Sequence, residues 1–160
     1  MFAADRPVGT KQEVYRELCL QARGLFEGER DAIANAANLA ALIHGGLEDV
    51  NWAGFYFLRG DELVLGPFQG QPACVRIPMG RGVCGTVAER REGIIVPDVE
   101  RFPGHIACDT ASRSEVAVPL LKNGRLLGVL DLDSPNCNRF SEEDRSGLET
   151  LAALWVEGSD

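Results

Sequence analysis

The sequence contains no long apolar run and no excess of basic residues. No apolar stretch approaches the roughly 18 residues of a membrane-spanning helix, and residues 1–10 lack the basic and apolar regions of a secretory signal. Of the 160 residues, 16 are Lys or Arg and 24 are Asp or Glu, which gives a formal net charge of −8. An acidic chain lacks the basic face that nucleic acid or an anionic membrane surface requires. We therefore predict a cytoplasmic protein without nucleic-acid or membrane partners.

The cysteines and histidines lack the spacing of a metal site. The chain has two histidines, His44 and His105, and five cysteines, which are Cys19, Cys74, Cys84, Cys108 and Cys137. An odd cysteine count without a signal peptide is not a disulfide framework. Structural zinc sites favour cysteines two to four residues apart, and no pair here is that close. The Gly80-Arg81-Gly82 loop lacks the ending of a phosphate-binding P-loop. We expect neither a metal nor a cofactor.

Composition and pattern predict one α+β domain. Apolar residues make up 45% of the chain and charged residues 25%, as in ordinary globular proteins. Apolar spacing predicts helices over 11–24 and 29–45, and a closing helix capped by Ser141 that runs to about Val156. A short helix is also expected from about Gly85 to Arg90, after the glycine-rich loop Gly80–Gly85. Shorter β-like runs fall at 52–58, 62–65, 73–77, 93–96, 115–121 and 126–133. We predict a single domain over residues 1–160, with its core at about 11–156. Helices should pack on one face of a mostly antiparallel sheet and long loops should lie on the other.

Two connections in this pattern are informative. Asn123-Gly124 separates two apolar runs, which is the strongest short sequence signal for a β-hairpin. Residues 97–114 show no periodicity and contain Pro103-Gly104. An irregular stretch longer than about 12–15 residues inside a compact domain is usually functional.

Three cysteines fall in the irregular middle of the chain. Cys74, Cys84 and Cys108 lie at strand ends or in loops, where a thiol is exposed enough to react. The alternative is that each is a small buried hydrophobe, as many intracellular cysteines are. Cys19 on a predicted helix and Cys137 in a polar turn are interpreted as structural or incidental.

Acidic residues converge at one end of the second hairpin. Asp131 and Asp133 are two residues apart on one strand, so both carboxylates point to the same face. Antiparallel pairing brings Glu115, at the start of the partner strand, close to them. Three crowded acids favour binding of a cationic or protonated ligand. The alternative is that they are solvent-exposed residues at the end of a strand. Trp52 and Tyr56 either pack in the core or form an apolar wall beside the acids, which would suit a small amphipathic ligand.

These residues resemble the free methionine-(R)-sulfoxide reductase family, whose members are single GAF domains. The similar segments cover most of the chain between about Lys11 and Val156. They are Asn51–Tyr56, Leu65–Gly70, Pro72–Cys74, Gly80–Gly85, Phe102–Asp109, Ser114–Glu115 and Gly128–Ser134. GAF domains in general lack this trio of cysteines, so the resemblance is specific and not only one of fold.

The resemblance implies a GAF-like fold and a redox activity. It places the catalytic thiol at Cys108, and the resolving and relay thiols at Cys84 and Cys74, with Cys84 favoured as the partner of Cys108. It places the substrate-contacting groups at Glu115, Asp131, Asp133, Trp52 and Tyr56. The implied reaction reduces free L-methionine (R)-S-oxide through a sulfenic acid and an intramolecular disulfide, which thioredoxin reopens. Oligomeric state is left open, a homodimer being one alternative.

The competing hypothesis is a GAF-type sensor module that binds a nucleotide or another small ligand. Such modules usually accompany an effector domain, for which a chain of 160 residues leaves no room. The two hypotheses differ in their need for thiols, because a sensor module would keep its function without them.

Overall fold

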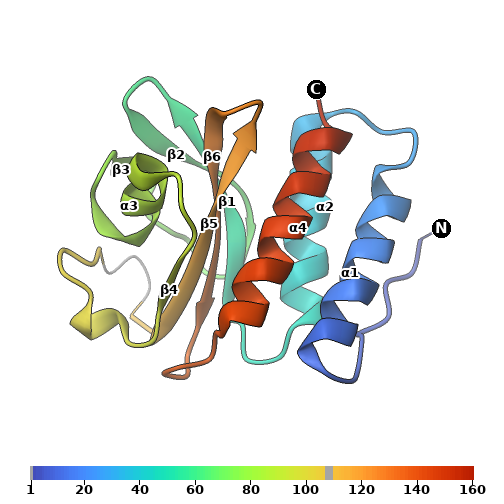
Figure 1. Cartoon of the computed structure of the whole chain (residues 1–160), viewed down its shortest axis with the longest axis horizontal. Coiled ribbons are helices and arrows are strands. Elements are labelled where there is room, and N and C mark those ends of the chain that lie inside the picture. The colour runs from blue at the N-terminus through green and yellow to red at the C-terminus, as the bar shows by residue number, and fades with distance from the viewer. Residues whose placement is uncertain (1, 107–109) are drawn as a thin grey trace.

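The computed structural model describes residues 2–106 and 110–160, which form one antiparallel sheet and its covering helices (Figure 1). The strands follow the order β3-β2-β1-β6-β5-β4, and every neighbouring pair is antiparallel. In chain order the elements are α1 (Lys11–Phe26), α2 (Ala32–Gly46), β1 (Trp52–Arg59), β2 (Glu62–Gln69), β3 (Arg76–Pro78), α3 (Gly82–Arg90), β4 (Ile94–Val96), η1 (Val99–Arg101), β5 (Ser114–Lys122), β6 (Arg125–Ser134) and α4 (Glu142–Gly158).

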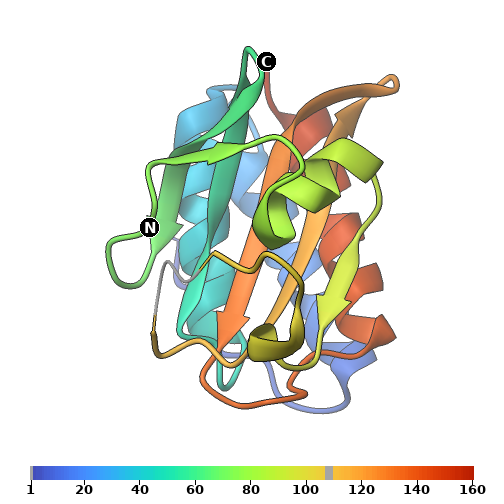
Figure 2. The same cartoon turned by 90° about the vertical axis from the view of Figure 1, so that its left-hand side faces the viewer.

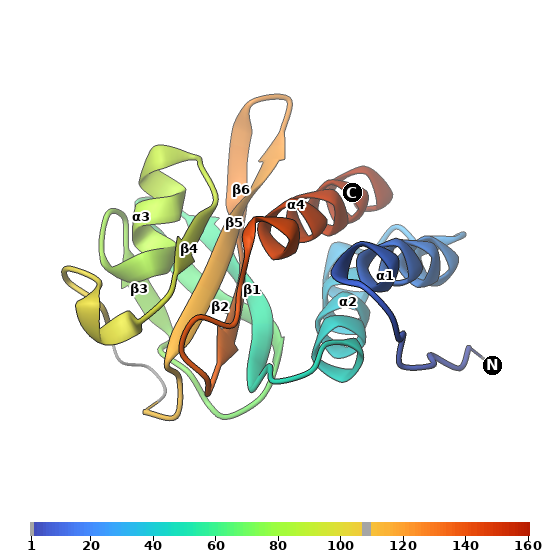
Figure 3. The same ribbon diagram turned by 60° about the horizontal axis from the view of Figure 1, so that its bottom comes forward.

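The sheet separates two apolar layers. Helices α2 and α4 cover one face, with α1 packed against both of them, and a core that includes Phe55, Leu130 and Trp155 lies between these helices and the sheet (Figure 3). A smaller cluster on the other face contains Trp52 and Tyr56. The short helix α3 and the segment around η1 lie over that second face (Figure 2). The predicted α+β class is confirmed, with α3 joining the loops opposite the three long helices.

Strand β6 shows how the alternation of side chains divides the two layers. Leu130 and Leu132 are fully buried in the core beneath the helices. The residues between and after them, Asp131 and Asp133, point to the opposite face because successive side chains in a strand alternate. Because β6 lies between β1 and β5 in the middle of the sheet, these two acids lie centrally on the face that α3 and the loops cover (Figure 2).

The predicted Asn-Gly hairpin is confirmed. Asn123 has φ 52° and Gly124 has φ 79°, so both turn residues adopt the left-handed conformation that a two-residue type I′ loop requires. The flanking residues Lys122 and Arg125 are directly paired across β5 and β6. This turn sets the pairing at the closed end, and a register shift between Leu120 and Leu121 moves the rest of the pairing by one residue, so that Glu115 meets Asp133.

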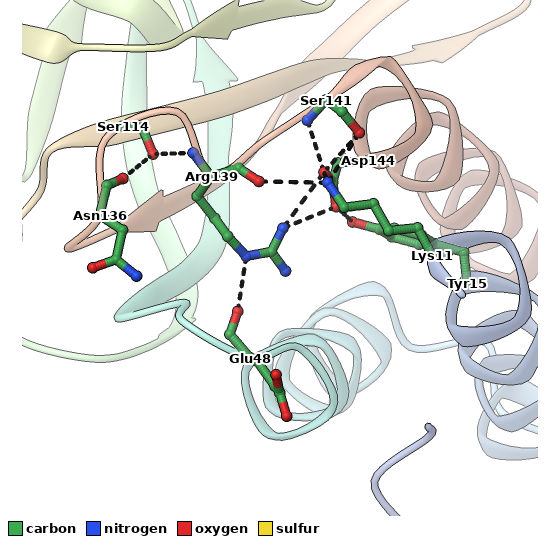
Figure 4. A network of polar contacts seen from close by, with 8 residues as sticks. All are labelled: Lys11, Tyr15, Glu48, Ser114, Asn136, Arg139, Ser141 and Asp144. Carbon is green, nitrogen blue, oxygen red and sulfur yellow. Dashed lines mark hydrogen bonds and ion pairs between the residues drawn. The ribbon is translucent and has the colours of Figure 1, made fainter. Parts of the chain in front are cut away.

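A buried ion network holds α1 against α4 (Figure 4). Asp144 is fully buried, and its carboxylate accepts hydrogen bonds from Tyr15 Oη at 2.8 Å, Lys11 Nζ at 2.5 Å and the Ser141 backbone N–H at 2.8 Å. Arg139 lies 3.3 Å from the same carboxylate. Burial alone would raise the pKa of Asp144, but these donors outweigh it and lower the pKa. Ser141 and Asp144 form a capping box, which confirms Ser141 as the N-cap of α4.

The chain ends lie on the helical side of the molecule. The N-terminal segment runs beside α1, and the C-terminus follows α4 (Figure 1). Asp160 is held there by an ion pair with Arg30 at 2.6 Å and by a backbone bond to the Arg30 carbonyl. Among the described helices, none combines the length and the apolar character that crossing a bilayer requires.

Candidate active site

Three acidic side chains meet where β5, β6 and β1 lie side by side. Glu115 on β5 is directly paired with Asp133 on β6, and Trp52 on β1 is paired with Asp133 from the other side. Glu115 and Asp131 are only 6% and 4% exposed, and Asp133 is half-buried. The sequence-based expectation that these acids converge is therefore met, and two of the three are core residues instead of a solvated strand end.

Helix α3 positions the thiol of Cys84 next to the acidic side chains. Its first residue, Gly82, has φ +62°, and a Cβ there would lie 3.2 Å from the side chain of Ile106, so glycine allows this tight start. The start lies three residues before the expected one, because the expectation took the glycine-rich loop to extend to Gly85. Cys84 follows in the first turn, is 4% exposed, and places Sγ 3.9 Å from Glu115 Oε1.

Burial dominates the electrostatics of this cluster. It raises the pKa of Glu115 to about 8, with a further contribution from the charge of Asp133. Burial and the neighbouring Glu115 raise the pKa of Asp131 well above its usual range. Burial and the acids Asp131 and Glu115 likewise raise the pKa of the Cys84 thiol. At neutral pH the cluster therefore holds at least one carboxylic acid proton, which can be donated to a bound oxygen atom.

Aromatic rings form one wall beside the acids. The ring of Trp52 stacks on Phe68 at 5.3 Å and on Tyr56 at 6.0 Å. Hydrogen bonds fix both polar tips, since Trp52 Nε1 donates to the Gln71 carbonyl at 3.1 Å and Tyr56 Oη donates to the Cys74 carbonyl at 2.9 Å. The wall is thus rigid and apolar, and the polar atoms of its rings are directed at the backbone.

A cavity lies between the aromatic wall, the acids and the start of α3. Its lining includes five predicted residues on the sheet, Trp52, Tyr56, Glu115, Asp131 and Asp133, together with Cys84 on α3. The remaining lining residues are Ala73, Ile77, Arg81, Gly82, Val83, His105, Ile106 and Ser112.

Sequence reasoning missed His105 as a residue of this site. Its Nε2 lies 3.8 Å from Glu115 Oε2, and burial lowers the pKa of the imidazole. Ser112 was missed as well. Both belong to the irregular stretch 97–114, whose lack of periodicity was the available signal. Arg81 and Gly82 had been weighed only as a weak phosphate loop.

The cysteines divide into three groups. Cys84 is a free thiol in the cavity wall, whereas Cys74, behind Tyr56, is disulfide-bonded. Cys19 on α1 and the exposed Cys137 after β6 are free thiols that do not line the cavity. Cys108, the expected catalytic thiol, lies outside the described residues.

Comparisons with known proteins agree with this geometry. A family model described as GAF domain matches residues 11–155. The chain is 51% identical over 143 residues to the free methionine-R-sulfoxide reductase of Escherichia coli, covering 89% of this chain and 87% of the relative. The chain belongs to this family of GAF-domain proteins. The GAF-like fold and the resemblance drawn from the sequence are confirmed.

Solved structures extend the comparison. The free methionine-R-sulfoxide reductase of Neisseria meningitidis, determined in complex with its substrate, has a TM-score of 0.94 and 42% identity over 99% of this chain and 95% of that one. The GAF domain of a phosphoenolpyruvate-protein phosphotransferase from Coxiella burnetii has a TM-score of 0.84 at 19% identity, covering 93% of this chain and 94% of that one. The second likeness concerns the fold alone.

Proposed function

We propose that this protein reduces free L-methionine (R)-S-oxide to L-methionine. The observation that carries the proposal is the buried group of Glu115, Asp131 and Cys84 beside the Trp52–Tyr56 wall. It offers a proton, negative charge and an apolar surface within one cavity. The relatives named free methionine-R-sulfoxide reductase support the same reaction.

Glu115 is the proposed proton donor. A sulfoxide sulfur becomes a good electrophile only when its oxygen is hydrogen-bonded or protonated. With a pKa of about 8, Glu115 carries a proton at neutral pH and can donate it to that oxygen. His105, near the Glu115 carboxylate, is placed to orient it.

The redox steps use the thiols of the middle segment. Cys108 attacks the sulfoxide sulfur, and the oxygen ends on Cys108 as a sulfenic acid while methionine leaves. A second thiol then condenses with the sulfenic acid, forming a disulfide and releasing water. We assign that second thiol to Cys74 and not to Cys84, the partner favoured from the sequence, because Cys74 is disulfide-bonded and Cys84 is a buried free thiol whose pKa is raised. A dithiol such as thioredoxin reopens the disulfide by exchange, which requires a reducing compartment such as the cytoplasm.

The acids and α3 are proposed to recognise the amino-acid end of the substrate. Asp131 and Asp133 attract the α-ammonium group, which a methionine inside a polypeptide lacks. The α-carboxylate would face the N-terminus of α3, where the backbone carries a positive partial charge and where Arg81 lines the cavity. The thioether then lies against Trp52. A peptide-bound substrate would leave the buried acids without their partner, so the pocket selects the free amino acid.

A direct assay tests the reaction. Incubation with dithiothreitol and racemic free methionine sulfoxide should convert about half of the substrate, because only the R epimer reacts. N-acetyl-methionine sulfoxide should react at least about 100-fold more slowly in kcat/KM, since a buried acid loses its charged partner. Equal rates on the free and acetylated substrates would contradict the assigned role of the acids. Absence of any conversion would favour a GAF sensor module instead.

Variants of the acids separate binding from chemistry. Asp133→Asn should mainly raise KM, because an ammonium contact acts in ground state and transition state alike. Glu115→Gln should mainly lower kcat, because the amide cannot protonate the oxygen. Loss of thioredoxin-supported turnover in Cys74→Ser, with the first turnover retained, would support the resolving role of Cys74.

A further inference from the structure

Cys84, Glu115 and Asp131 place three metal-ligating atoms together. They come from α3, β5 and β6, and one ligand atom of each lies within 4.8 Å of the other two. All three side chains are more than 90% buried. Their separation in sequence hides the group from any search for paired cysteines or histidines, which is why spacing alone pointed away from a metal.

One oxygen of this group has no hydrogen-bond partner among the described residues. Asp131 lines the cavity and its Oδ1 is buried without a hydrogen bond, whereas side-chain hydrogen bonds join the carboxyl group as a whole to Glu115 and Cys84. A buried carboxylate oxygen without a partner is unfavourable. A cation bound beside it would supply the missing partner.

The distance between Cys84 Sγ and Glu115 Oε1 suits a borderline-soft cation. Zinc bonds of about 2.3 Å to sulfur and about 2.0 Å to oxygen in a tetrahedral site put those two ligand atoms roughly 3.5 Å apart. Cys84 Sγ and Glu115 Oε1 are 3.9 Å apart, so a few tenths of an ångström of movement would suffice. A thiolate excludes magnesium or calcium as the preferred ion, because those ions prefer oxygen ligands alone.

We propose that the reduced protein binds one Zn²⁺ ion through Cys84, Glu115 and Asp131, and that this ion competes with the substrate. Binding forms a zinc–sulfur bond and two zinc–oxygen bonds and releases the thiol proton, together with any proton on the acids, to solvent. The fourth position faces the cavity, as in zinc sites that keep one position open to solvent. The competition rests on the proposed function, because the ion occupies Asp131, one of the two acids assigned to the substrate ammonium, and removes the proton of Glu115.

Binding is measured without turnover. Protein reduced with a phosphine, which leaves no competing thiol in solution, is titrated with Zn²⁺ against a chromophoric chelator, and with Co²⁺ as a spectroscopic probe. We expect one ion per chain and a near-ultraviolet sulfur-to-cobalt charge-transfer band. Cys84→Ser should abolish the band, and Asp131→Asn should weaken zinc affinity by at least about 100-fold. Cys19→Ser and Cys137→Ser are the matched controls and should bind as the wild type does.

Three outcomes would overturn the site. They are a stoichiometry well below one, a cobalt band that persists in Cys84→Ser, and a band lost only in Cys108→Ser, which would place the ion on another thiol. Thermal unfolding of each variant without metal shows whether a lost signal reflects lost folding. Glu115→Gln provides a second route to the answer, because it removes a ligand while keeping the shape of the side chain.

Inhibition is a separate arm of the test. If the proposed function holds, zinc should raise the apparent KM for free methionine sulfoxide and leave kcat unchanged, and added chelator should reverse the effect. Binding without this competition would refute the inhibitory role and leave the metal site standing. If the protein lacked reductase activity altogether, the cobalt spectrum and stoichiometry would still decide the site.

Discussion

Replacing Glu115 with glutamine should remove most of the dependence of stability on pH between about pH 5 and pH 8. In the folded protein the pKa of Glu115 is about 8, against an ordinary value of 4.5. Between these two values the folded chain holds a proton that the unfolded chain has lost. Rising pH therefore favours unfolding through this window, and the stability that Glu115 provides below it is lost as the pH passes the folded value.

The magnitude follows from the interval between the two pKa values. The difference between about 8 and 4.5 is about 3.5 pH units, and each unit corresponds to about 1.4 kcal/mol, so the upper bound is about 5 kcal/mol. Because Glu115 and Asp131 titrate together, the pH dependence of the unfolding free energy belongs to the pair. We therefore expect Glu115→Gln to remove about 2–4 kcal/mol of the change in unfolding free energy across this pH range. The variant should accordingly become more stable than the wild type near pH 8.

Urea unfolding in the presence of a reductant measures this pH dependence of the unfolding free energy directly. The unfolding free energy is obtained at several pH values from about 5 to 8 for the wild type, for Glu115→Gln and for Glu92→Gln, whose side chain is exposed. The control should keep the wild-type slope. If the wild type and Glu115→Gln gave parallel curves, Glu115 would be ionised at neutral pH, and its assignment as proton donor would fail.

Other perturbations give equally definite expectations. Cys108→Ser should abolish steady-state methionine formation, whereas Cys137→Ser should leave kcat/KM within about twofold of the wild type. Appreciable turnover by Cys108→Ser would show that another residue is the nucleophile. Asp144→Ala should lower the unfolding free energy by about 1–3 kcal/mol, because it leaves the buried Tyr15 hydroxyl without its acceptor and removes the carboxylate that pairs with Lys11 and Arg139. A loss well below about 1 kcal/mol in urea unfolding would mean that the network is dispensable. Gly85→Ala puts a Cβ 2.6 Å from the Pro78 carbonyl oxygen and should be destabilising by about 1–3 kcal/mol. Gly45→Ala on α2 meets nothing within 4 Å and should be neutral or stabilising. Thermal unfolding of the two variants checks this difference.

The sequence predicted the sheet-borne half of the site because strand periodicity is local information. The Asn123-Gly124 turn closes the hairpin, and a one-residue register shift between Leu120 and Leu121 then places Glu115 opposite Asp133. No comparable rule links α3 to the sheet. That Cys84 faces Glu115 depends on how the helix packs across β5 and β6, a long-range contact that spacing in the chain does not encode.

Element boundaries show the same limit on a smaller scale. The strand expected to begin at Ala73 begins at Arg76, because only the last part of that run pairs with β2. The helix expected from Glu29 begins at Ala32, where Asp31 accepts the Ala34 N–H as an N-cap. In each case a specific hydrogen-bonding partner, a neighbouring strand or an N-cap side chain, decided where the element begins, and the intrinsic propensity of the run did not. His105 escaped notice for a related reason, since a single histidine in an irregular stretch carries no pattern.

The position of the chain ends on the helical side has a practical consequence. An affinity tag, a surface linker or a fused reporter attached at either terminus would emerge on the face opposite the cavity (Figure 1). Immobilised through Asp160, the molecule would present α3 and the loops outward to small molecules in solution.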